Sequence, residues 1–200
     1  MLRADCVALV TAAGASTRMG SPKALVDWGG RPLVAHQAAT LAGFRDVAVV
    51  VGAEAERVMT AAPLPAPARY VVHPGWAAGR SSSLEVGARA LPDDAGAVLV
   101  CAVDQPLTTA TVDALLAAFD PAAHDLAQPL AAGRPGHPLL LAGRLLAALR
   151  RASAHPTGLR DIVRAARHRA LLVPVDDPGV HADLNTPDAL RIERVLRREP

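Results

Sequence analysis

The segment "CVALVTAAGASTRMGSPK" (6–23) decides the fold class, because it joins a continuous apolar run to a loop rich in glycine, hydroxyl and cationic side chains. An apolar run without polar alternation is typical of a strand that is covered on both faces of a sheet. Ligands of open α/β sheets bind beyond the carboxyl ends of the strands, where such a loop lies. The segment therefore predicts an α/β protein with a binding site after its first strand.

Outward from this segment, strand-like and helix-like stretches alternate along the chain. Repeated β-α alternation predicts a largely parallel sheet with helices on both faces. We expect strands at 6–12, 46–52, 69–73, 97–103 and 170–175, and helices at 32–44, 54–62, 81–91, 108–119, 142–152, 158–168 and 187–199. The stretch 126–141 predicts two short strands around a Gly/Pro turn.

The composition fits one domain with an aliphatic core. The chain has 200 residues, of which 51% are hydrophobic and only 2% aromatic, and no repeat or long linker divides it. We therefore expect a single domain over 1–200. A net charge of +2 argues against a dedicated nucleic-acid binder.

The sequence also indicates where the protein works. It shows no signal peptide and no apolar run of membrane length. Cys6 and Cys101 lie in apolar runs that are typical of small core residues, and no histidine has the spacing of a zinc site. We expect a protein of the reducing cytoplasm that binds neither a membrane nor nucleic acid.

The loop after the first strand allows two interpretations. It is an ordinary turn, since Gly and Ser favour turns in any protein, or it is a cradle for phosphate groups. In a cradle, Gly14 lets the backbone approach a ligand, and Ser16 and Thr17 offer hydroxyl donors. Arg18 and Lys23 add positive charge. The loop is neither a Walker loop nor a G-x-G-x-x-G dinucleotide motif, so composition alone leaves both interpretations open.

The segment "LVTAAGASTRMGSPKAL" (9–25) closely resembles the first motif of nucleotidyltransferases that make sugar-nucleotide-like products, L-A-[AG]-G-x-[SG]-x-R-[MF]-G-x-x-K-x-L. It is most similar to the MobA-like NTP transferases, and among them to the molybdenum cofactor cytidylyltransferases. Four later segments resemble further motifs of this family and follow the family's order: "HPGWAAGRSSSLEVGARAL" (73–91), "VDQP" (103–106), "GRPGHPLLL" (133–141) and "DLNTPDAL" (183–190). Thr11 and His73 depart from the commoner Leu and Asn.

The resemblance implies a Rossmann-like three-layer sandwich of the nucleotide-diphospho-sugar transferase type, with a mostly parallel sheet. It implies an enzyme that moves CMP from CTP to the terminal phosphate of molybdopterin or the molybdenum cofactor and releases pyrophosphate. Such a transfer depends on charge neutralisation and in-line positioning. Arg18, Lys23 and Asp104 are then the catalytic residues.

The same resemblance implies Mg²⁺ as cofactor, with Asp104 and Asp183 as its ligands, because Mg²⁺ often takes one or two carboxylates. From the residues alone, Asp104 fits a helix N-terminal anion or a turn residue slightly better than a metal ligand. Asp183 fits an Asx-turn or a cap near the helix at 187. Asp176 and Asp177 are interpreted as turn residues.

Nucleotide contacts carried over from the family begin in the opening loop, where backbone groups of Ala12 and Ala13 meet the base edge. The Cβ of Ala13 narrows the base pocket, since guanylyl members usually have Ala-Gly-Gly where cytidylyl members have Ala-Ala-Gly. We therefore favour CTP, while a selectivity of about 1–3 kcal/mol from one methyl group does not exclude GTP. The full set of expected nucleotide contacts is Ala12, Ala13, Gly14, Ser16, Arg18, Lys23, Gly79 and Ser83.

The residues that contact the acceptor are the least clearly indicated by the sequence. His137 is the candidate acceptor contact, although "GRPGHP" also fits a hairpin turn in which Gly136 adopts an unusual φ. Trp76 either stacks on a pterin or covers the edge of the core. Ser81, Ser82 and Ser83 also fit simple capping of a helix.

Two other functions stay open. One is a GTP-dependent guanylyltransferase for the same cofactor, and the other is a nucleotide-binding accessory protein that matures a molybdenum cofactor without turnover. The expected partners are an NTP, a molybdopterin-type acceptor, and a molybdoenzyme or its maturation chaperone.

Overall fold

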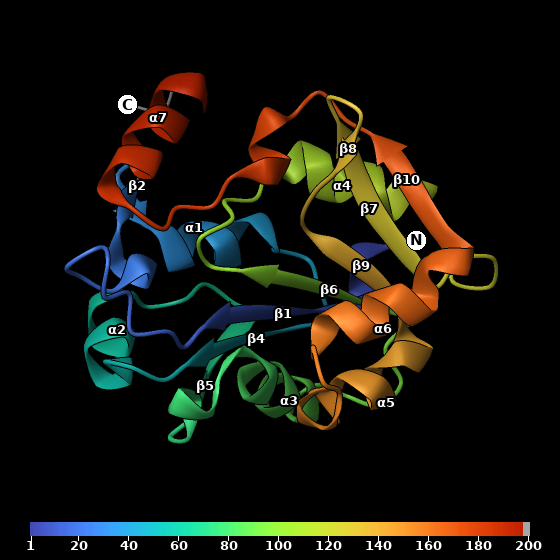
Figure 1. Ribbon diagram of the computed structural model, residues 1–200, viewed down its shortest axis with the longest axis horizontal. Coiled ribbons are helices and arrows are strands. Elements are labelled where there is room, and N and C mark those ends of the chain that lie inside the picture. Colours follow the sequence, from blue (N-terminus) through green and yellow to red (C-terminus); the bar gives the residue numbers. More distant parts are fainter. Residues whose placement is uncertain (198–200) are drawn as a thin grey trace.

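The computed structural model describes residues 1–197. Its main sheet has eight strands (Figure 1). Seven of them lie in the order β10-β7-β9-β6-β1-β4-β5, and the eighth, β8, pairs with β7. Its strands are β1 (Cys6–Ala12), β4 (Asp46–Val51), β5 (Ala68–Val72), β6 (Ala97–Ala102), β7 (Leu126–Ala131), β8 (Arg134–Pro135), β9 (Leu139–Ala142) and β10 (Ala170–Pro174). A two-stranded hairpin is formed by β2 (Asp27–Trp28) and β3 (Arg31–Pro32).

The helices lie between these strands along the chain. The α-helices are α1 (Leu33–Thr40), α2 (Ala55–Ala61), α3 (Arg80–Ala90), α4 (Thr109–Ala118), α5 (Leu146–Leu149), α6 (Leu159–Ala166) and α7 (Pro187–Arg197). Short 3₁₀ turns are η1 (Arg3–Asp5), η2 (Lys23–Leu25), η3 (Trp76–Ala78), η4 (Gly143–Leu145), η5 (Ala152–Ala154), η6 (Arg167–Arg169) and η7 (Pro178–His181).

Strand direction brings several loops to one edge of the sheet. β1 pairs in parallel with β4 and β6, and β4 pairs in parallel with β5. β10 pairs in parallel with β7, whereas β9 is antiparallel to both β6 and β7. The carboxyl ends of β1 and β6 therefore meet the beginning of β9 at one edge.

The core has two halves, one on each face of the sheet. Successive residues of β1 point to opposite faces: Ala8 and Val10 belong to the half covered by α1, α2 and α4, while Val7 and Leu9 belong to the half covered by α3, α5 and α6. Figure 1 shows α3, α5 and α6 together on one side of the sheet. The result is three layers, as expected for an α/β fold with aliphatic strands buried on both faces.

A glycine lets α3 lie unusually close to the sheet. A Cβ on Gly87 would stand 2.1 Å from Leu9 Cδ1 and 2.6 Å from Val50 Cγ2, both in central strands. The helix is thereby fixed against β1 and β4, and its N-terminus is held at the carboxyl edge of the sheet.

The structure confirms the predicted fold class and the alternating strands and helices. It differs between 126 and 141, where three strands replace the expected two. The turn there is formed by Ala132 and Gly133, both with positive φ. Gly136 does not adopt the unusual φ; it is needed because a Cβ there would stand 2.6 Å from Val180 Cγ2.

Other differences concern the ends of helices. The expected helix 142–152 is broken into η4 and the short α5, and residues 198–199 of the expected helix 187–199 lie outside the described residues. The β2–β3 hairpin was not predicted. The capping prediction for Ser81, Ser82 and Ser83 is wrong, because the N-cap of α3 is Gly79 and no side chain caps it.

None of the helices among residues 1–197 is both long enough and apolar enough to cross a membrane. Cys6 and Cys101 are buried in β1 and β6, which confirms them as core residues.

Candidate active site

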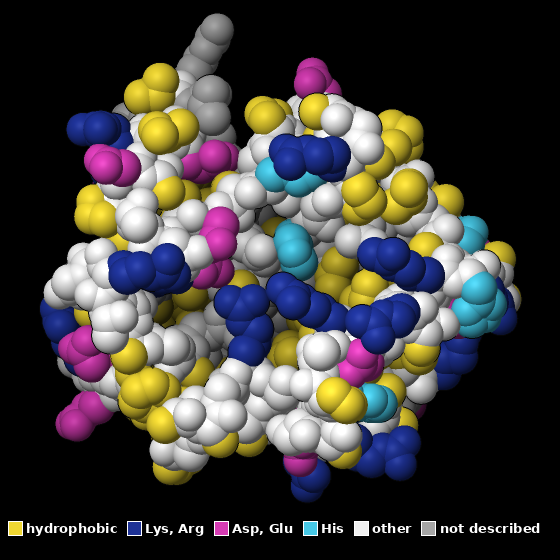
Figure 2. All heavy atoms as spheres, in the orientation of Figure 1, with side chains coloured by type: hydrophobic (Ala, Val, Ile, Leu, Met, Phe, Trp, Pro, Cys, Tyr) yellow, Lys and Arg dark blue, Asp and Glu magenta, His cyan; other side chains and the backbone are white. Residues whose placement is uncertain are grey.

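A cavity of about 310 Å³ lies where β1 and β6 end. On the face drawn in Figure 2, acidic and cationic side chains gather around a hollow in the middle of the molecule. The cavity wall is formed mainly by the loop after β1, the turn after β6 and the stretch from η3 into α3, with Ala53 from the segment after β4. Its lining residues are Thr11, Ala12, Ala13, Gly14, Ser16, Pro22, Lys23, Ala24, Ala53, Trp76, Ala77, Gly79, Arg80, Ser83, Ala102, Val103 and Asp104.

The loop after β1 is folded around Ser16. Ser16 has a φ of 52°, and its carbonyl accepts a hydrogen bond of 2.8 Å from the amide of Met19. Its hydroxyl oxygen accepts a hydrogen bond of 3.0 Å from the amide of Lys23. The loop therefore turns back on itself, so that Lys23 returns to the sheet edge. Space is left at Gly14, where a Cβ would meet no atom within 4 Å.

Lys23 reaches across the sheet edge to the turn after β6. Its Nζ donates a hydrogen bond of 2.7 Å to Oδ2 of Asp104, and it also donates to Oδ1 of Asn185. Both partners of the Lys23–Asp104 ion pair are largely buried, with side chains that are 15% and 9% exposed. Burial of an ion pair needs such additional hydrogen bonds, because both charges lose their water. Lys23, Asp104 and Asn185 thus form one polar cluster.

Asp183 joins this cluster through the backbone. The amide of Leu184 donates a hydrogen bond of 2.9 Å to the carbonyl of Asp104, which fixes the segment after η7 beside the turn after β6. Although Asp183 is exposed, partial desolvation and then the negative charge of Asp104 raise its pKa above the usual value. The two carboxylates therefore repel each other, and a cation between them would relieve that repulsion.

This donor set fits a hard divalent cation. Two carboxylates and the amide oxygen of Asn185 are oxygen ligands, and Mg²⁺ often uses only one or two protein carboxylates. Within residues 1–197 no group of three or more His, Cys, Asp and Glu side chains forms a larger metal cluster. The cluster fits a metal shared with a ligand better than an all-protein site.

A buried glutamine holds the turn that carries Asp104. Gln37 in α1 is fully buried, and its Nε2 donates to the carbonyls of Ala102 at 3.2 Å and Gln105 at 2.8 Å. Its Oε1 accepts a hydrogen bond of 3.0 Å from the amide of Leu107. One side chain thus satisfies backbone groups on both sides of Asp104, so the position of this carboxylate depends on α1.

The start of α3 is shaped by Gly79 and a serine–histidine pair. Gly79 has φ of 110°, a conformation that L residues rarely adopt. Its carbonyl accepts a hydrogen bond of 2.7 Å from the hydroxyl of Ser82, whose oxygen lies 2.9 Å from Nε2 of the buried His73. Ser83 is buried and Arg80 begins the helix, and both line the cavity.

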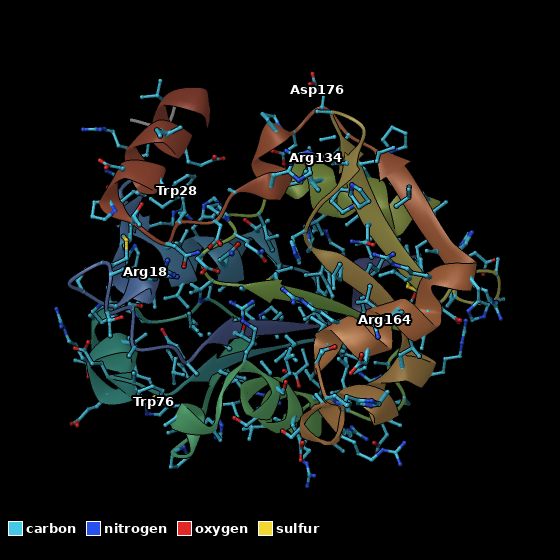
Figure 3. The ribbon with its side chains drawn as sticks, viewed as in Figure 1. Arg18, Trp28, Trp76, Arg134, Arg164 and Asp176 are labelled. Carbon is cyan, nitrogen blue, oxygen red and sulfur yellow. The ribbon has the colours of Figure 1, made fainter. Side chains whose placement is uncertain are left out.

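The structure brings most of the expected residues together. Three expected residues do not line the cavity: Arg18, His137 and Asp183. Arg18 is exposed on the loop after β1 (Figure 3). The carbonyl of Ala13 already accepts a hydrogen bond of 3.0 Å from the amide of Ala53, which leaves less of this backbone for a base. The expected residues that do line the cavity are Ala12, Ala13, Gly14, Ser16, Lys23, Gly79, Ser83 and Asp104.

His137 lies beside the cavity at the start of β9. Its amide donates a hydrogen bond of 2.8 Å to the carbonyl of Val180. Burial, followed by the positive charge of Arg80, lowers the pKa of His137, while the charges of Asp104 and Asp183 act in the opposite direction. The imidazole therefore faces the same group of charges as the polar cluster, although it is not part of the cavity lining.

Asp176 and Asp177 lie away from this site, as expected for turn residues. Asp177 accepts a hydrogen bond of 3.0 Å from the amide of Gly179, and its other oxygen accepts hydroxyl hydrogen bonds from Thr108 and Thr111 at 2.8 and 2.7 Å. Asp176 is exposed at the far end of the molecule in Figure 3. Trp76 is partly buried, lines the cavity and packs against the core half that contains α3.

Sequence reasoning missed three residues of the site. Arg80 stands within the motif at 73–91 as a cation directly after the glycine before a helix, so a signal for it was present. Asn185 follows Asp183 within "DLNTPDAL", but its contact with Lys23 depends on tertiary structure. Gln37 carries no motif, and only the fold reveals that it is buried.

Comparison with known proteins gives a consistent family assignment. The sequence model of the MobA-like NTP transferase domain matches residues 8–175. The 2-C-methyl-D-erythritol 4-phosphate cytidylyltransferase of Streptomyces coelicolor is 36% identical over 123 residues, which are 56% of this chain and 45% of that protein. The bifunctional protein GlmU of Clavibacter sepedonicus is 38% identical over 124 residues, 59% of this chain and 25% of GlmU. The matches thus span less than half of these relatives.

Several solved structures have a similar fold over almost the whole length of this chain. The homologue of Mycobacterium tuberculosis Rv0371c from Mycobacterium sp. strain JC1 has a TM-score of 0.80 and 26% identity, covering 99% of this chain and 100% of that chain. Rv0371c of M. tuberculosis in complex with manganese has a TM-score of 0.70 and 25% identity, covering 94% and 96%. The molybdopterin-guanine dinucleotide biosynthesis protein A of Archaeoglobus fulgidus, at 0.68 and 17% identity over 97% and 100%, shares the fold.

Proposed function

The chain belongs to the family of MobA-like NTP transferase domains, and on this premise we propose that it is a nucleotidyltransferase that acts as one domain. The proposed reaction moves CMP from CTP to the terminal phosphate of a molybdopterin-type acceptor. An oxygen of the acceptor phosphate attacks the α-phosphorus of the nucleotide. The bond between the α-phosphorus and the bridging oxygen breaks, and pyrophosphate leaves with that electron pair.

One observation carries the proposal: Lys23 and Asp104 form an ion pair in the wall of the cavity that the glycine-containing loop after β1 also lines. Phosphoryl and nucleotidyl transfers need positioned charge more than covalent help from the protein. Lys23 supplies a cation for the phosphates, and the open space at Gly14 allows the backbone to approach them. No side-chain nucleophile is needed.

A divalent cation belongs to the proposal because the donor set of Asp104, Asp183 and Asn185 fits one. Mg²⁺ is proposed, and the manganese complex of Rv0371c supports a divalent ion at a related protein. When bound, the metal would neutralise charge on the phosphates. Asp104 and Asp183 would hold it, and Lys23 would exchange its carboxylate partner for a phosphate oxygen.

Arg18 can contact the nucleotide phosphates, as proposed, only if the loop after β1 changes its conformation. Its guanidinium is exposed on the loop after β1 and does not line the cavity. It would contact the β- or γ-phosphate when the loop folds over a bound nucleotide, as lid-like loops do in other enzymes.

The base and the acceptor rest on finer features. Ala13 lines the cavity, and its methyl group is proposed to narrow the space for a base. This supports CTP over GTP. Similarity to the cytidylyltransferase of Streptomyces coelicolor also favours CTP. The guanine dinucleotide protein of Archaeoglobus fulgidus has the same fold, so the fold alone does not choose between CTP and GTP. His137 is proposed as an acceptor contact.

A pyrophosphate-release assay tests the proposal. The purified protein is incubated with Mg²⁺ and each NTP in turn, with and without molybdopterin, and release with CTP plus molybdopterin is expected. If pyrophosphate were released with GTP and with no other NTP, the proposed nucleotide would be GTP instead of CTP. If nucleotides bound but none of the four NTPs gave pyrophosphate, the protein would be a nucleotide-binding accessory protein and not an enzyme.

A further inference from the structure

Arg80 is a cation in the cavity wall whose side chain has no assigned task. It is the first residue of α3 and lines the same cavity as Lys23 and Asp104. Lys23 is engaged by Asp104 and Asn185, whereas no hydrogen bond or ion pair holds the Arg80 guanidinium within residues 1–197. Its charge is therefore available to an anion that enters the cavity.

The neighbours of Arg80 in α3 are fixed, and this fixes its own backbone. Ser81 lies against Gly158, where a Cβ would stand 2.1 Å from the Ser81 hydroxyl. Ser82 is bonded to Gly79 and His73, and Ser83 is buried. The chain thus holds the base of the Arg80 side chain rigidly while the guanidinium stays exposed.

Arg80 and Lys23 approach the cavity from different segments of the chain. Arg80 lines it from the start of α3, whereas Lys23 lines it from the end of the loop after β1. The charge of Arg80 also acts on His137, which is partly buried just before β9.

We propose that Arg80 binds the phosphate of the acceptor, so that the site selects acceptors that carry a phosphomonoester. This deepens the proposed function and rests on it for the identity of the reaction. Two anions must come together in that reaction, and two cations line the cavity from different segments: Lys23, which would face the triphosphate once a nucleotide is bound, and Arg80, which enters from the start of α3. A guanidinium forms two parallel hydrogen bonds with a phosphate, which also orients it for attack.

The test measures binding of a simple phosphomonoester, glycerol 2-phosphate, by its ³¹P line width as the protein is added. The titration is run on nucleotide-free protein and on protein saturated with a non-hydrolysable CTP analogue, whose own affinity is measured by calorimetry. Arg80→Gln and Arg80→Lys are compared with Arg31→Gln, a control that removes the same charge from an exposed residue outside the cavity. Thermal melting checks that each variant is folded.

We expect Arg80→Gln to weaken phosphomonoester binding about tenfold or more, with the affinity for the CTP analogue unchanged. Arg80→Lys should recover part of the loss, and Arg31→Gln should match the wild type. The proposal is overturned if the wild type does not bind the phosphomonoester, if Arg80→Gln binds it equally well, or if Arg80→Gln weakens the CTP analogue instead. Failure of the proposed function is distinguishable, because the nucleotide-free titration does not depend on any NTP.

Discussion

At the residue scale, the ion pair between Lys23 and Asp104 joins two segments that are 81 positions apart in the chain. The sequence could identify both residues, because each lies in a motif. It could not show that they touch each other, since this depends on how β1 and β6 are paired. Arg18 shows the opposite case: its motif position is as specific as that of Lys23, yet the loop leaves it exposed.

Asp104→Asn should lower kcat by at least about 10²-fold, because it removes a negative charge from the proposed metal site and phosphate-facing cluster. The turn should keep its shape, since the Asp104 carbonyl still accepts from Leu184. Steady-state pyrophosphate release measures the loss, and circular dichroism the fold. Asp176→Asn is the matched control, and near-normal turnover in Asp104→Asn would show that the carboxylate has no catalytic role.

Ala13→Gly should reduce the preference for CTP over GTP by about tenfold, because it removes the methyl group that narrows the base pocket. The ratio of kcat/KM for the two nucleotides gives this directly. An unchanged ratio, with the variant still folded, would mean that another part of the cavity chooses the base.

At the scale of elements, the apolar runs predicted the strands well, because parallel strands buried on both faces carry long runs of Val, Leu and Ala. The runs carry no direction, so nothing in them revealed that β9 is antiparallel to β6 and β7. The expected helix at 142–152 is broken by tertiary contact: Gly143 is bonded to Gly96 at 2.9 Å, and a Cβ on it would stand 1.7 Å from the carbonyl oxygen of Ala95. Close packing of Gly143 against Ala95 and Gly96 therefore prevents a continuous helix there.

The contact between α1 and the turn after β6 gives a prediction for Gln37. Gln37→Leu removes the partners of several buried backbone groups, so it should lower the free energy of unfolding by about 1–3 kcal/mol. It should also lower kcat, because Asp104 lies in the turn that Gln37 holds. Urea unfolding and pyrophosphate release are measured on the same sample.

Gln37→Glu serves as the comparison, since it keeps the shape and an acceptor but loses the donors. If Gln37→Leu were fully stable and active, the turn would be held by other contacts.

At the scale of the whole molecule, two buried thiols make the protein sensitive to alkaline solution. Burial, more than the nearby Asp5, raises the pKa of Cys6 to about 11, and burial, more than Asp104, raises that of Cys101 to about 12, from an ordinary 9.0. A raised folded-state pKa contributes stability below pH 9.0 that is lost as the pH rises toward these values. The unfolded chain ionises first and is favoured.

The free energy of unfolding should therefore fall between about pH 9 and about pH 11, by up to about 1.4 kcal/mol per pH unit for each thiol. Urea unfolding at a series of pH values measures the slope. Cys6→Ala should make the slope shallower, whereas an identical slope in that variant would assign the alkaline loss to other groups.

Taken over the whole chain, the motifs predicted which segments meet, because parallel strands deliver their loops to one edge of the sheet. They did not reveal the side chains that support the site from behind. Gln37, His73 and Ser82 act through hydrogen bonds formed in the tertiary structure, and the polar character of one residue does not indicate which groups it will bind.

The reversed direction of β9 has a consequence for how this scaffold can diversify. Because β9 runs against β6 and β7, the hairpin before it returns to the reactive edge without a crossover helix, and residues 132–138 form a short insert between two buried strands. Such an insert can be exchanged for another of different length while β1, β4 and β6 keep their pairing. Under the proposed role of His137 as an acceptor contact, grafting this segment between family members is a route to a new acceptor on an unchanged sheet.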